Sequence, residues 1–297
     1  MDVMFASGLR SVHYLPGHGR RVGRCYLLAM TSIAVSQRAG VGELLRDWRQ
    51  RRRLSQLELA GEADISTRHL SFIENGRSQP SRSMLLRLAE RLDMPLRARN
   101  EMLNAAGFAA LYAERPLDAP EMSVARRAID AVLDAHAPFP ALAVDRHWTL
   151  VASNAAVAAL LGGVSAELLQ GSANVLRLSL HPQGLAPRIV NLAEWRAHLL
   201  ARLQQQIDRS ADAQLVALRA ELAAYPAPGG DAPAHDSGGI AVPLRLRVDG
   251  LAAPLSLIST TTVFGTPVEV TLSELALECF YPADDATREA LQRLARP

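Results

Sequence analysis

Residues 53–81 have the sequence RLSQLELAGEADISTRHLSFIENGRSQPS, and this stretch decides the fold of the first third of the chain. It holds two helix starts that lie eleven residues apart. Ser55 is the capping residue of the first, where Glu58 completes a capping box, and Ser66 is the capping residue of the second. Gly76 then ends the second helix, because glycine readily adopts the left-handed backbone of a helix terminus. Two short helices joined by a tight turn form a helix-turn-helix.

Further helices are predicted on both sides of this pair. Upstream, apolar residues recur with the spacing of one helix face at Val41, Leu44, Leu45 and Trp48. Downstream, Ser81 begins a helix with three inward leucines, and another helix runs from Leu96 to Ala106 before Gly107. The prediction is an all-α domain of five helices over residues 39–107.

Residues 43–92, and most closely the stretch quoted above, resemble the Cro/repressor-like (XRE) helix-turn-helix family. The resemblance covers all five predicted helices and implies binding to double-stranded DNA. Two residues weaken the pattern. Asp64 occupies a turn position that is often Gly in the family, and Gly61 weakens its helix by about 1 kcal/mol relative to Ala. Neither residue changes the predicted fold.

The second helix of such a pair lies in the major groove with its N-terminal residues at the base edges. Arg68 is therefore predicted to contact guanine through two hydrogen bonds, worth about 1–3 kcal/mol of discrimination. Phe72 is interpreted either as a contact to a thymine methyl group or as core, and His69 either as a DNA contact or as a solvated side chain. The resemblance implies a phosphate contact for Gln56. The residues predicted to contact DNA are Gln56, Ser66, Thr67, Arg68, His69, Phe72, Asn75 and Arg77.

Charge is distributed unevenly along the chain, whose 32 basic residues are all arginine. Residues 1–99 hold 17 Arg against 9 acidic residues, whereas residues 100–297 hold 15 Arg against 21. A basic half attracts polyanions, so this division predicts a nucleic-acid-binding part joined to a domain with another role. Arg49, Arg52 and Arg53 belong to the basic half, and the alternatives of a DNA contact and a solvated face stay open for them.

Residues 121–297 are predicted to form a second domain after a proline-containing linker at residues 108–120. Apolar residues alternate or β-branched residues cluster in several short segments, which is typical of strands. Strands are predicted within residues 141–154, 241–248, 254–264 and 268–272. Helices are predicted at residues 123–136, 155–161, 185–223 and 285–295. The expected fold is α+β, with an antiparallel sheet and helices packed against it.

Three segments of this domain look like the ligand-binding domain of MmyB-like transcription regulators. They are DRHWTLVASNAA (145–156), NVLRLSLHPQGLAPRIVNLAEWRAHLLARL (174–203) and TTTVFGTPVEVTLSELALECFYPAD (260–284). The resemblance runs over most of residues 120–290 and implies a PAS-like sheet with helices around a pocket. Some members of that family are associated with fatty-acid-like ligands, so such a ligand is expected here, and no other cofactor.

A mostly apolar pocket with few polar anchors is the usual form of a small-molecule site. The candidate ligand-binding residues are polar or aromatic groups within apolar stretches, namely Trp148, Asn154, His181, Arg188, Trp195 and His198. Arg188 is suited to pair with a carboxylate. Other interpretations stay open: Trp195 as a core residue, His181 as a support for its loop, and Asn154 as a helix N-cap.

The sequence contains no pattern typical of catalysis or of a metal site. It has no phosphate-binding glycine loop, no G-x-S-x-G, no H-E-x-x-H and no paired C-x-x-C. Cys25 and Cys279 have no metal-ligand spacing and suggest no disulfide framework, which fits a reduced cytoplasm. No apolar run approaches the roughly 20 residues of a membrane helix. We therefore expect a cytoplasmic protein that is not an enzyme and has no membrane partner.

Residues 1–38 are expected to be a poorly ordered extension, with Met30 a second candidate start besides Met1. Arg20 and Arg21, followed by an apolar stretch, faintly resemble a secretion signal. That stretch is short and leads directly into a DNA-binding domain, so export is disfavoured.

Together these features predict a sequence-specific DNA-binding transcription regulator, either a repressor or an activator. We expect a homodimer on a partly palindromic operator, with DNA binding controlled by a small apolar or fatty-acid-like ligand in the second domain. An alternative is that the second domain is a protein-interaction or dimerisation module without a small-molecule ligand. The sequence leaves open the ligand, the operator and the direction of the control.

Overall fold

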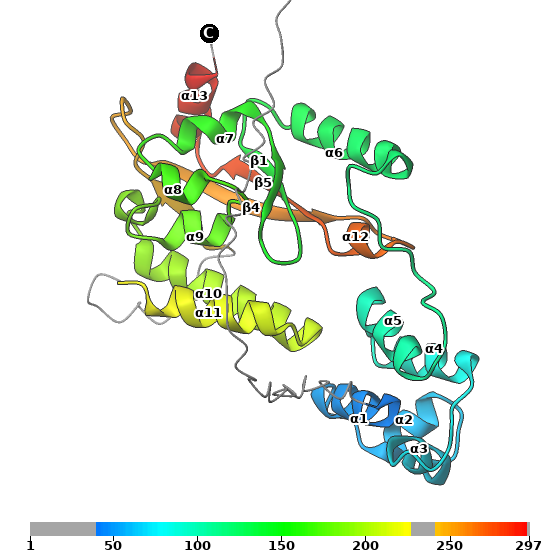
Figure 1. Ribbon diagram of the computed structural model, residues 1–297. Helices are drawn as coiled ribbons and strands as arrows, with labels where there is room; N and C mark the ends of the chain where they lie inside the picture. Colours follow the sequence, from blue (N-terminus) through cyan, green and yellow to red (C-terminus); the bar gives the residue numbers. More distant parts are fainter. Residues whose placement is uncertain (1–39, 227–240, 296–297) are drawn as a thin grey trace, which may run out of the picture. The chain divides into compact units, whose positions relative to one another are not determined.

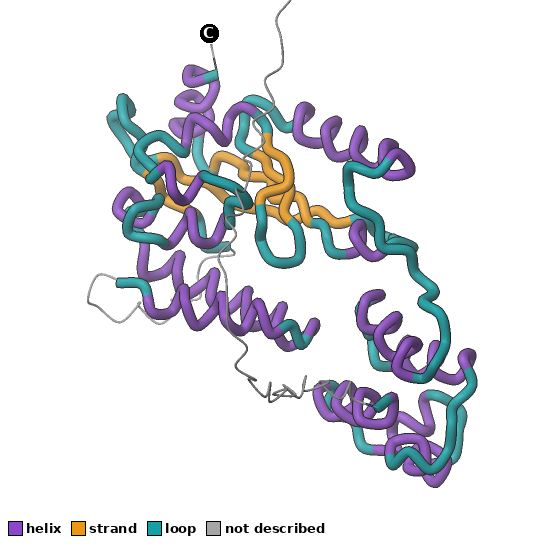
Figure 2. The backbone as a smooth tube through the Cα atoms, viewed as in Figure 1, coloured by secondary structure: helices purple, strands orange, loops and turns teal. Residues whose placement is uncertain are grey.

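The structure is a computed structural model that describes residues 40–226 and 241–295 (Figure 1). The expected extension at residues 1–38 lies outside the described residues. All the strands described follow residue 140, and the regular structure before it is helical (Figure 2). The predicted fold class, an all-α domain followed by an α+β domain, is confirmed.

Five helices form the first domain. They are α1 (Val41–Arg51), α2 (Gln56–Glu62), α3 (Thr67–Glu74), α4 (Arg82–Arg91) and α5 (Leu96–Ala105). The Ser55, Ser66 and Ser81 hydroxyls accept backbone N–H hydrogen bonds at the starts of α2, α3 and α4, as the sequence predicts. The apolar faces of the helices meet in one core. Its fully buried members include Leu45, Leu59, Leu70, Leu85 and Met102.

Backbone geometry sets the turn between α2 and α3 and the contact between α1 and α3. Asp64 has a φ of 53°, the left-handed conformation that this turn requires. Gly42 lies so close to α3 that a Cβ would come within 2.5 Å of the Ile73 carbonyl oxygen. A side chain at this position would push α1 away from α3, so the close packing of these helices requires glycine.

A buried ion pair ties α1 to α3. Arg49 donates from Nε and Nη2 to the Glu74 carboxylate at 2.7 and 2.9 Å, so Arg49 is an interior residue of the domain. Gln56 donates to the same carboxylate at 2.8 Å and brings α2 into the cluster. Burial raises the pKa of Glu74, but the hydrogen bonds from Arg49 and Gln56 outweigh burial and hold the pKa below its ordinary value.

The second domain contains a five-stranded sheet in the order β2-β1-β5-β4-β3, in which every neighbouring pair is antiparallel. The strands are β1 (Ala141–Val144), β2 (Leu150–Ser153), β3 (Leu244–Leu246), β4 (Leu255–Val263) and β5 (Ala276–Pro282). The helices are α6 (Ser123–Ala135), α7 (Ala155–Leu160), α8 (Ala166–Leu169), α9 (Val175–Leu180), α10 (Leu192–Ser210), α11 (Ala213–Ala224), α12 (Val270–Ser273) and α13 (Asp285–Leu294). Two short 3-10 turns, Pro120–Met122 and Ala186–Arg188, complete the domain.

Different helices cover the two faces of the sheet. On β1, Ala141 and Ala143 pack with apolar residues of α6, whereas Leu142 packs with the larger core that includes residues of α7, α9 and α10. The same alternation holds on β5, where Leu277 and Cys279 belong to the α6 side. The sheet therefore separates a thin apolar layer from a thick one, and the thick layer has room for a cavity.

The prediction of a strand at residues 268–272 is wrong. This segment is a loop followed by the one-turn helix α12, and the strand lies further on, as β5. The Glu269 carboxylate accepts the Leu272 N–H at 2.9 Å and so caps α12. Val268 is 80% exposed, so the apolar alternation does not mark a buried strand face here.

The predicted helical segment at residues 185–223 is interrupted. Ala211 adopts a left-handed conformation with a φ of 60° and ends α10. The Asp212 side chain then accepts the Gln214 N–H and caps α11. The chain thus reverses direction between α10 and α11, which pack on each other.

The strand predicted at residues 241–248 is shorter than expected and is limited to Leu244–Leu246.

The substitution Glu74→Gln is expected to destabilise the first domain by about 3–5 kcal/mol, because it leaves the interior Arg49 without its partner charge. Hydrogen–deuterium exchange of peptides within residues 40–107 measures the loss in the full chain. Glu90→Gln, at an exposed position of α4, is the control and should leave exchange unchanged. Equal protection in both variants would show that the ion pair does not stabilise this domain.

The same carboxylate makes the stability of the domain pH-dependent. The folded-state pKa of Glu74 lies below its ordinary value of 4.5, so its contribution is fully present above about pH 4.5 and is lost as the pH falls through the folded-state pKa. The protection factors of the same peptides, which are corrected for the slower intrinsic exchange at low pH, should therefore fall on acidification below this value. In Glu74→Gln that part of the pH dependence should disappear. A slope that persists undiminished in the variant would assign it to other carboxylates.

Candidate functional site

The exposed start of α3 presents the residues that are predicted to contact base edges. Ser66 caps the helix by accepting the His69 N–H at 3.1 Å, and Thr67 and Arg68 follow in the first turn. The exposed Arg68 guanidinium lies 5.3 Å from the centre of the half-buried Phe72 ring. Since a cation is attracted to the face of an aromatic ring, the two side chains lie together on the outward side of α3.

The remaining residues predicted to contact DNA differ in how far they are engaged within the domain. His69 is half-buried, and its Nε2 has no hydrogen-bond partner within the described part of the chain. Arg77 is exposed in the loop after α3. Gln56 donates to the buried carboxylate described above, and Asn75 accepts from Arg46 at 2.7 Å. A phosphate contact from Gln56 or Asn75 would share the side chain with these internal bonds.

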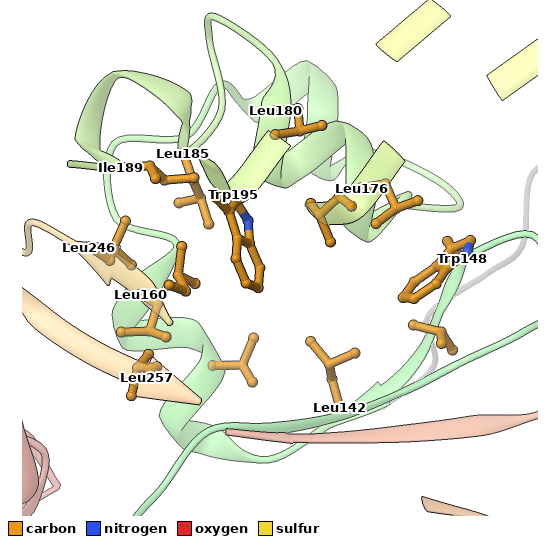
Figure 3. Packing of buried hydrophobic residues seen from close by; sticks show 14 of the residues in the cluster. Leu142, Trp148, Leu160, Leu176, Leu180, Leu185, Ile189, Trp195, Leu246 and Leu257 are labelled. Carbon is orange, nitrogen blue, oxygen red and sulfur yellow. The ribbon is translucent and has the colours of Figure 1, made fainter. Parts of the chain in front are cut away.

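An apolar cavity of about 100 Å³ lies in the second domain between the sheet and helices α7, α9 and α10. Figure 3 shows Leu142 of β1, Leu160 of α7 and Trp195 of α10 directed toward the same space. Apolar cavities of about 150 Å³ bind benzene. This cavity has about two thirds of that volume, so it suits a small apolar group.

One end of the cavity is polar. Arg202 of α10 donates from Nη1 and Nη2 to the two oxygens of Glu278 on β5, at 3.0 and 2.5 Å. Thr261 of β4 joins them: its hydroxyl donates to Glu278 at 3.0 Å and accepts from Arg202 at 2.6 Å. The Glu278 side chain is 4% exposed and that of Arg202 is 26% exposed. A charge pair that is already complete thus forms part of the wall of a mostly apolar site.

Trp148 forms part of the cavity wall and is strained. Its φ of 66° is left-handed, a conformation that costs a bulky residue on the order of 1–3 kcal/mol. The indole N–H donates to Gln206 at 2.8 Å, and the Arg202 guanidinium lies 4.6 Å from the ring centre. The ring is thereby held between the apolar lining and the polar end of the cavity.

Of the other predicted ligand residues, Trp195 also lines the cavity, and its indole N–H donates to Ser179 at 3.0 Å. His198 stacks on Trp195 with ring centres 5.5 Å apart and does not itself line the cavity. Arg188 donates to the Leu160 carbonyl oxygen at 2.7 Å and lies outside the lining. The structure thus brings two of the six candidates, both tryptophans, to the cavity.

Asn154 and His181 serve the fold at other places. Asn154 precedes α7, but its side chain makes no cap and instead bonds to backbone groups of Leu133, Phe139 and Ala141. His181 Nδ1 accepts the Gln183 N–H at 3.1 Å, and its ring packs edge-on against Tyr225. The support of a loop by His181, one of the interpretations left open, agrees with these contacts.

Sequence reasoning missed Arg202 and Glu278. A signal for Arg202 exists, because it follows Trp195 and Leu199 at positions i+7 and i+3 and so interrupts the apolar stripe of α10. Glu278 likewise occupies an inward position of β5, between Ala276 and Phe280. Two opposite charges on inward faces of different elements indicate a buried pair.

A cluster of charges next to Trp148 reaches the first domain. His147 Nε2 lies 2.9 Å from the Asp212 carboxylate, and Arg146 lies 3.7 Å from both Asp212 and Glu274. Glu274 in turn accepts two hydrogen bonds from Arg97 of α5, at 2.8 and 2.9 Å. Burial raises the pKa of Asp212, but its hydrogen bond with His147 and the nearby Arg146 charge hold the pKa below its ordinary value.

Comparison with known proteins adds two family matches. Residues 45–98 match a helix-turn-helix family, and residues 125–294 match the MmyB-like transcription regulator ligand binding domain. No curated protein matches the chain. Among solved structures, a chain of the SinR protein/SinI protein complex is 22% identical, covers 31% of this chain and 82% of its own length, and has a TM-score of 0.20. That TM-score is too low to support an argument.

Within the described residues, every helix is too short or too polar to span a membrane.

The helix-turn-helix family match covers the first domain, and the MmyB-like match spans more than half of the chain, including the whole sheet and the cavity. A DNA-binding domain is therefore followed by a ligand-binding domain. The chain belongs to the family of MmyB-like transcription regulators.

Proposed function

We propose that this regulator binds a partly palindromic operator as a homodimer in the cytoplasm and changes its affinity for DNA when a small apolar ligand fills the cavity. The observation that carries the proposal is the apolar cavity of the second domain, with the strained Trp148 in its wall. Small-molecule sites combine an apolar lining with few polar groups, as this cavity does. The chain of a fatty-acid-like molecule would meet the same lining.

DNA recognition is assigned to the exposed start of α3. Arg68 extends from the first turn with Phe72 beneath its guanidinium, which limits the freedom of the long side chain. A planar guanidinium that is held in this way suits the two acceptors of a guanine edge. The Glu74 cluster at the other end of α3 fixes the helix against α1 and α2.

Control of DNA binding requires two states that ligand and DNA prefer to different degrees. Trp148 is in contact with the cavity, and the two residues before it, Arg146 and His147, belong to the charge cluster that includes Arg97 of α5. A ligand that moves the Trp148 ring would therefore displace the backbone of this cluster. The proposed coupling passes from the cavity wall to the DNA-binding domain through these adjacent residues.

Arg68→Ala is expected to lower the preference for operator over scrambled DNA by about 5- to 150-fold, which corresponds to the loss of one guanine contact of about 1–3 kcal/mol. The operator is first selected from random DNA with the parent protein, and affinities are then compared at a fixed salt concentration. Arg91→Ala removes an exposed arginine from the last turn of α4 and should leave the ratio unchanged. An unchanged ratio in Arg68→Ala would remove this residue from base recognition.

Ligand binding is tested by extracting the purified protein under denaturing conditions and identifying co-purified molecules by mass spectrometry. n-Hexanol then serves as a defined apolar probe, and at 100 times its Kd it should stabilise the protein by about 2.7 kcal/mol. For a domain of this size that is a rise in Tm of about 5–10 °C.

Leu176→Phe places extra volume in the cavity and should abolish most of that rise in Tm. Leu218→Phe enlarges an equally buried residue of α11 that does not line the cavity, and it should retain the rise. Leu160→Phe, on α7, replaces the first variant if overpacking unfolds it. An empty extract together with no shift in Tm would favour a protein-interaction module instead.

A further inference from the structure

We propose that the molecule bound in this cavity carries an uncharged polar group, such as a hydroxyl, ester or amide, at the end that meets Arg202. This inference rests on the proposed function, because it specifies the chemistry of a ligand in the same cavity. It replaces the acid group of a fatty-acid-like ligand with a neutral one and keeps the apolar chain.

The charges of the cavity are already balanced. Among the described residues that line it, two carry charge, Arg202 and Glu278, and they form a two-point ion pair. Thr261 donates a further hydrogen bond to Glu278. The site therefore offers a ligand neither a free positive charge nor a free negative charge.

A ligand carboxylate would have to share Arg202 with Glu278. Two carboxylates and one guanidinium would leave a net negative charge in a site where Glu278 is almost completely buried. Displacing Glu278 from Arg202 would be no better, because its carboxylate lies in the middle of β5 and would remain buried without its partner. A ligand ammonium group would instead add a positive charge next to Arg202 and leave the site with a net positive charge.

A neutral polar group meets no such obstacle. The lining contains two hydroxyls, Ser179 and Ser259, and a serine hydroxyl offers one donor and two acceptor positions. Trp195 uses one acceptor position of Ser179. A ligand hydroxyl, ester or amide can exchange hydrogen bonds with such groups and leave the ion pair intact.

The test compares three probes with the same six-carbon chain near neutral pH: n-hexanol, hexanoate and hexylamine. Binding to the full-length protein is measured by calorimetry and by the shift in Tm. n-Hexanol is expected to bind at least about tenfold more tightly than either ion, since each ion adds an unbalanced charge to a buried site. Hexanoate binding as tightly as n-hexanol, or more tightly, would overturn the proposal.

Two single variants should change which of the three probes binds most tightly. In Glu278→Gln the guanidinium of Arg202 loses its partner, so hexanoate should become the preferred probe. In Arg202→Gln the carboxylate of Glu278 is left unbalanced, so hexylamine should be preferred. The double variant Arg202→Gln/Glu278→Gln has no charge at this end and should again prefer n-hexanol, which keeps the test decisive where a single variant does not fold.

The outcomes also separate this inference from the proposed function. Binding of hexanoate by the parent protein and its loss in the double variant would retain a ligand cavity but assign Arg202 as a carboxylate anchor. Failure of all three probes in parent and variants, with an empty extract, would overturn both the ligand cavity and its neutral specificity.

Discussion

Strand β5 lies between β1 and β4, and the alternation of its side chains sets what each face of the sheet can bury. Leu277 and Cys279 complete the thin layer beneath α6, whereas Glu278 and Phe280 face the cavity. A residue in this strand cannot change sides without a shift of the whole register, because successive side chains point to opposite faces. The core, the cavity and its charged end therefore depend on one strand pairing.

The five helices of the first domain could be predicted from sequence because their determinants are local. Caps such as Ser55 and Ser66 act within three residues, and the apolar spacing of α1 lies within a few turns. The prediction of a strand at residues 268–272 is wrong for a related reason, because apolar alternation is also a local signal. Val268 and Glu269 follow the alternating pattern, but they lie in a loop whose Glu269 side chain caps a short helix. Local signals identify elements well where a core confirms them.

The residues of the cavity could be predicted from the sequence only in part. Trp148 and Trp195 could be selected because large aromatic residues within apolar stretches are rare enough to stand out. The pairing of Arg202 with Glu278 could not be inferred from the sequence, since it joins a helix to a strand 76 residues further on and depends on the register of β5. Asn154 and Arg188 have polar side chains that could also bind a ligand, yet both side chains form hydrogen bonds to backbone groups instead. Residue type alone does not distinguish these uses.

The three tryptophans of the chain are distributed in a way that has a practical consequence. Trp48 is buried in the helical domain, whereas Trp148 and Trp195 both border the cavity. Indole emission depends on the polarity and the charges near the ring, and Trp148 has a guanidinium 4.6 Å from its centre. Two of the three indole rings thus border the space that a ligand would fill, so the tryptophan emission of the unlabelled chain is an optical gauge of its occupancy.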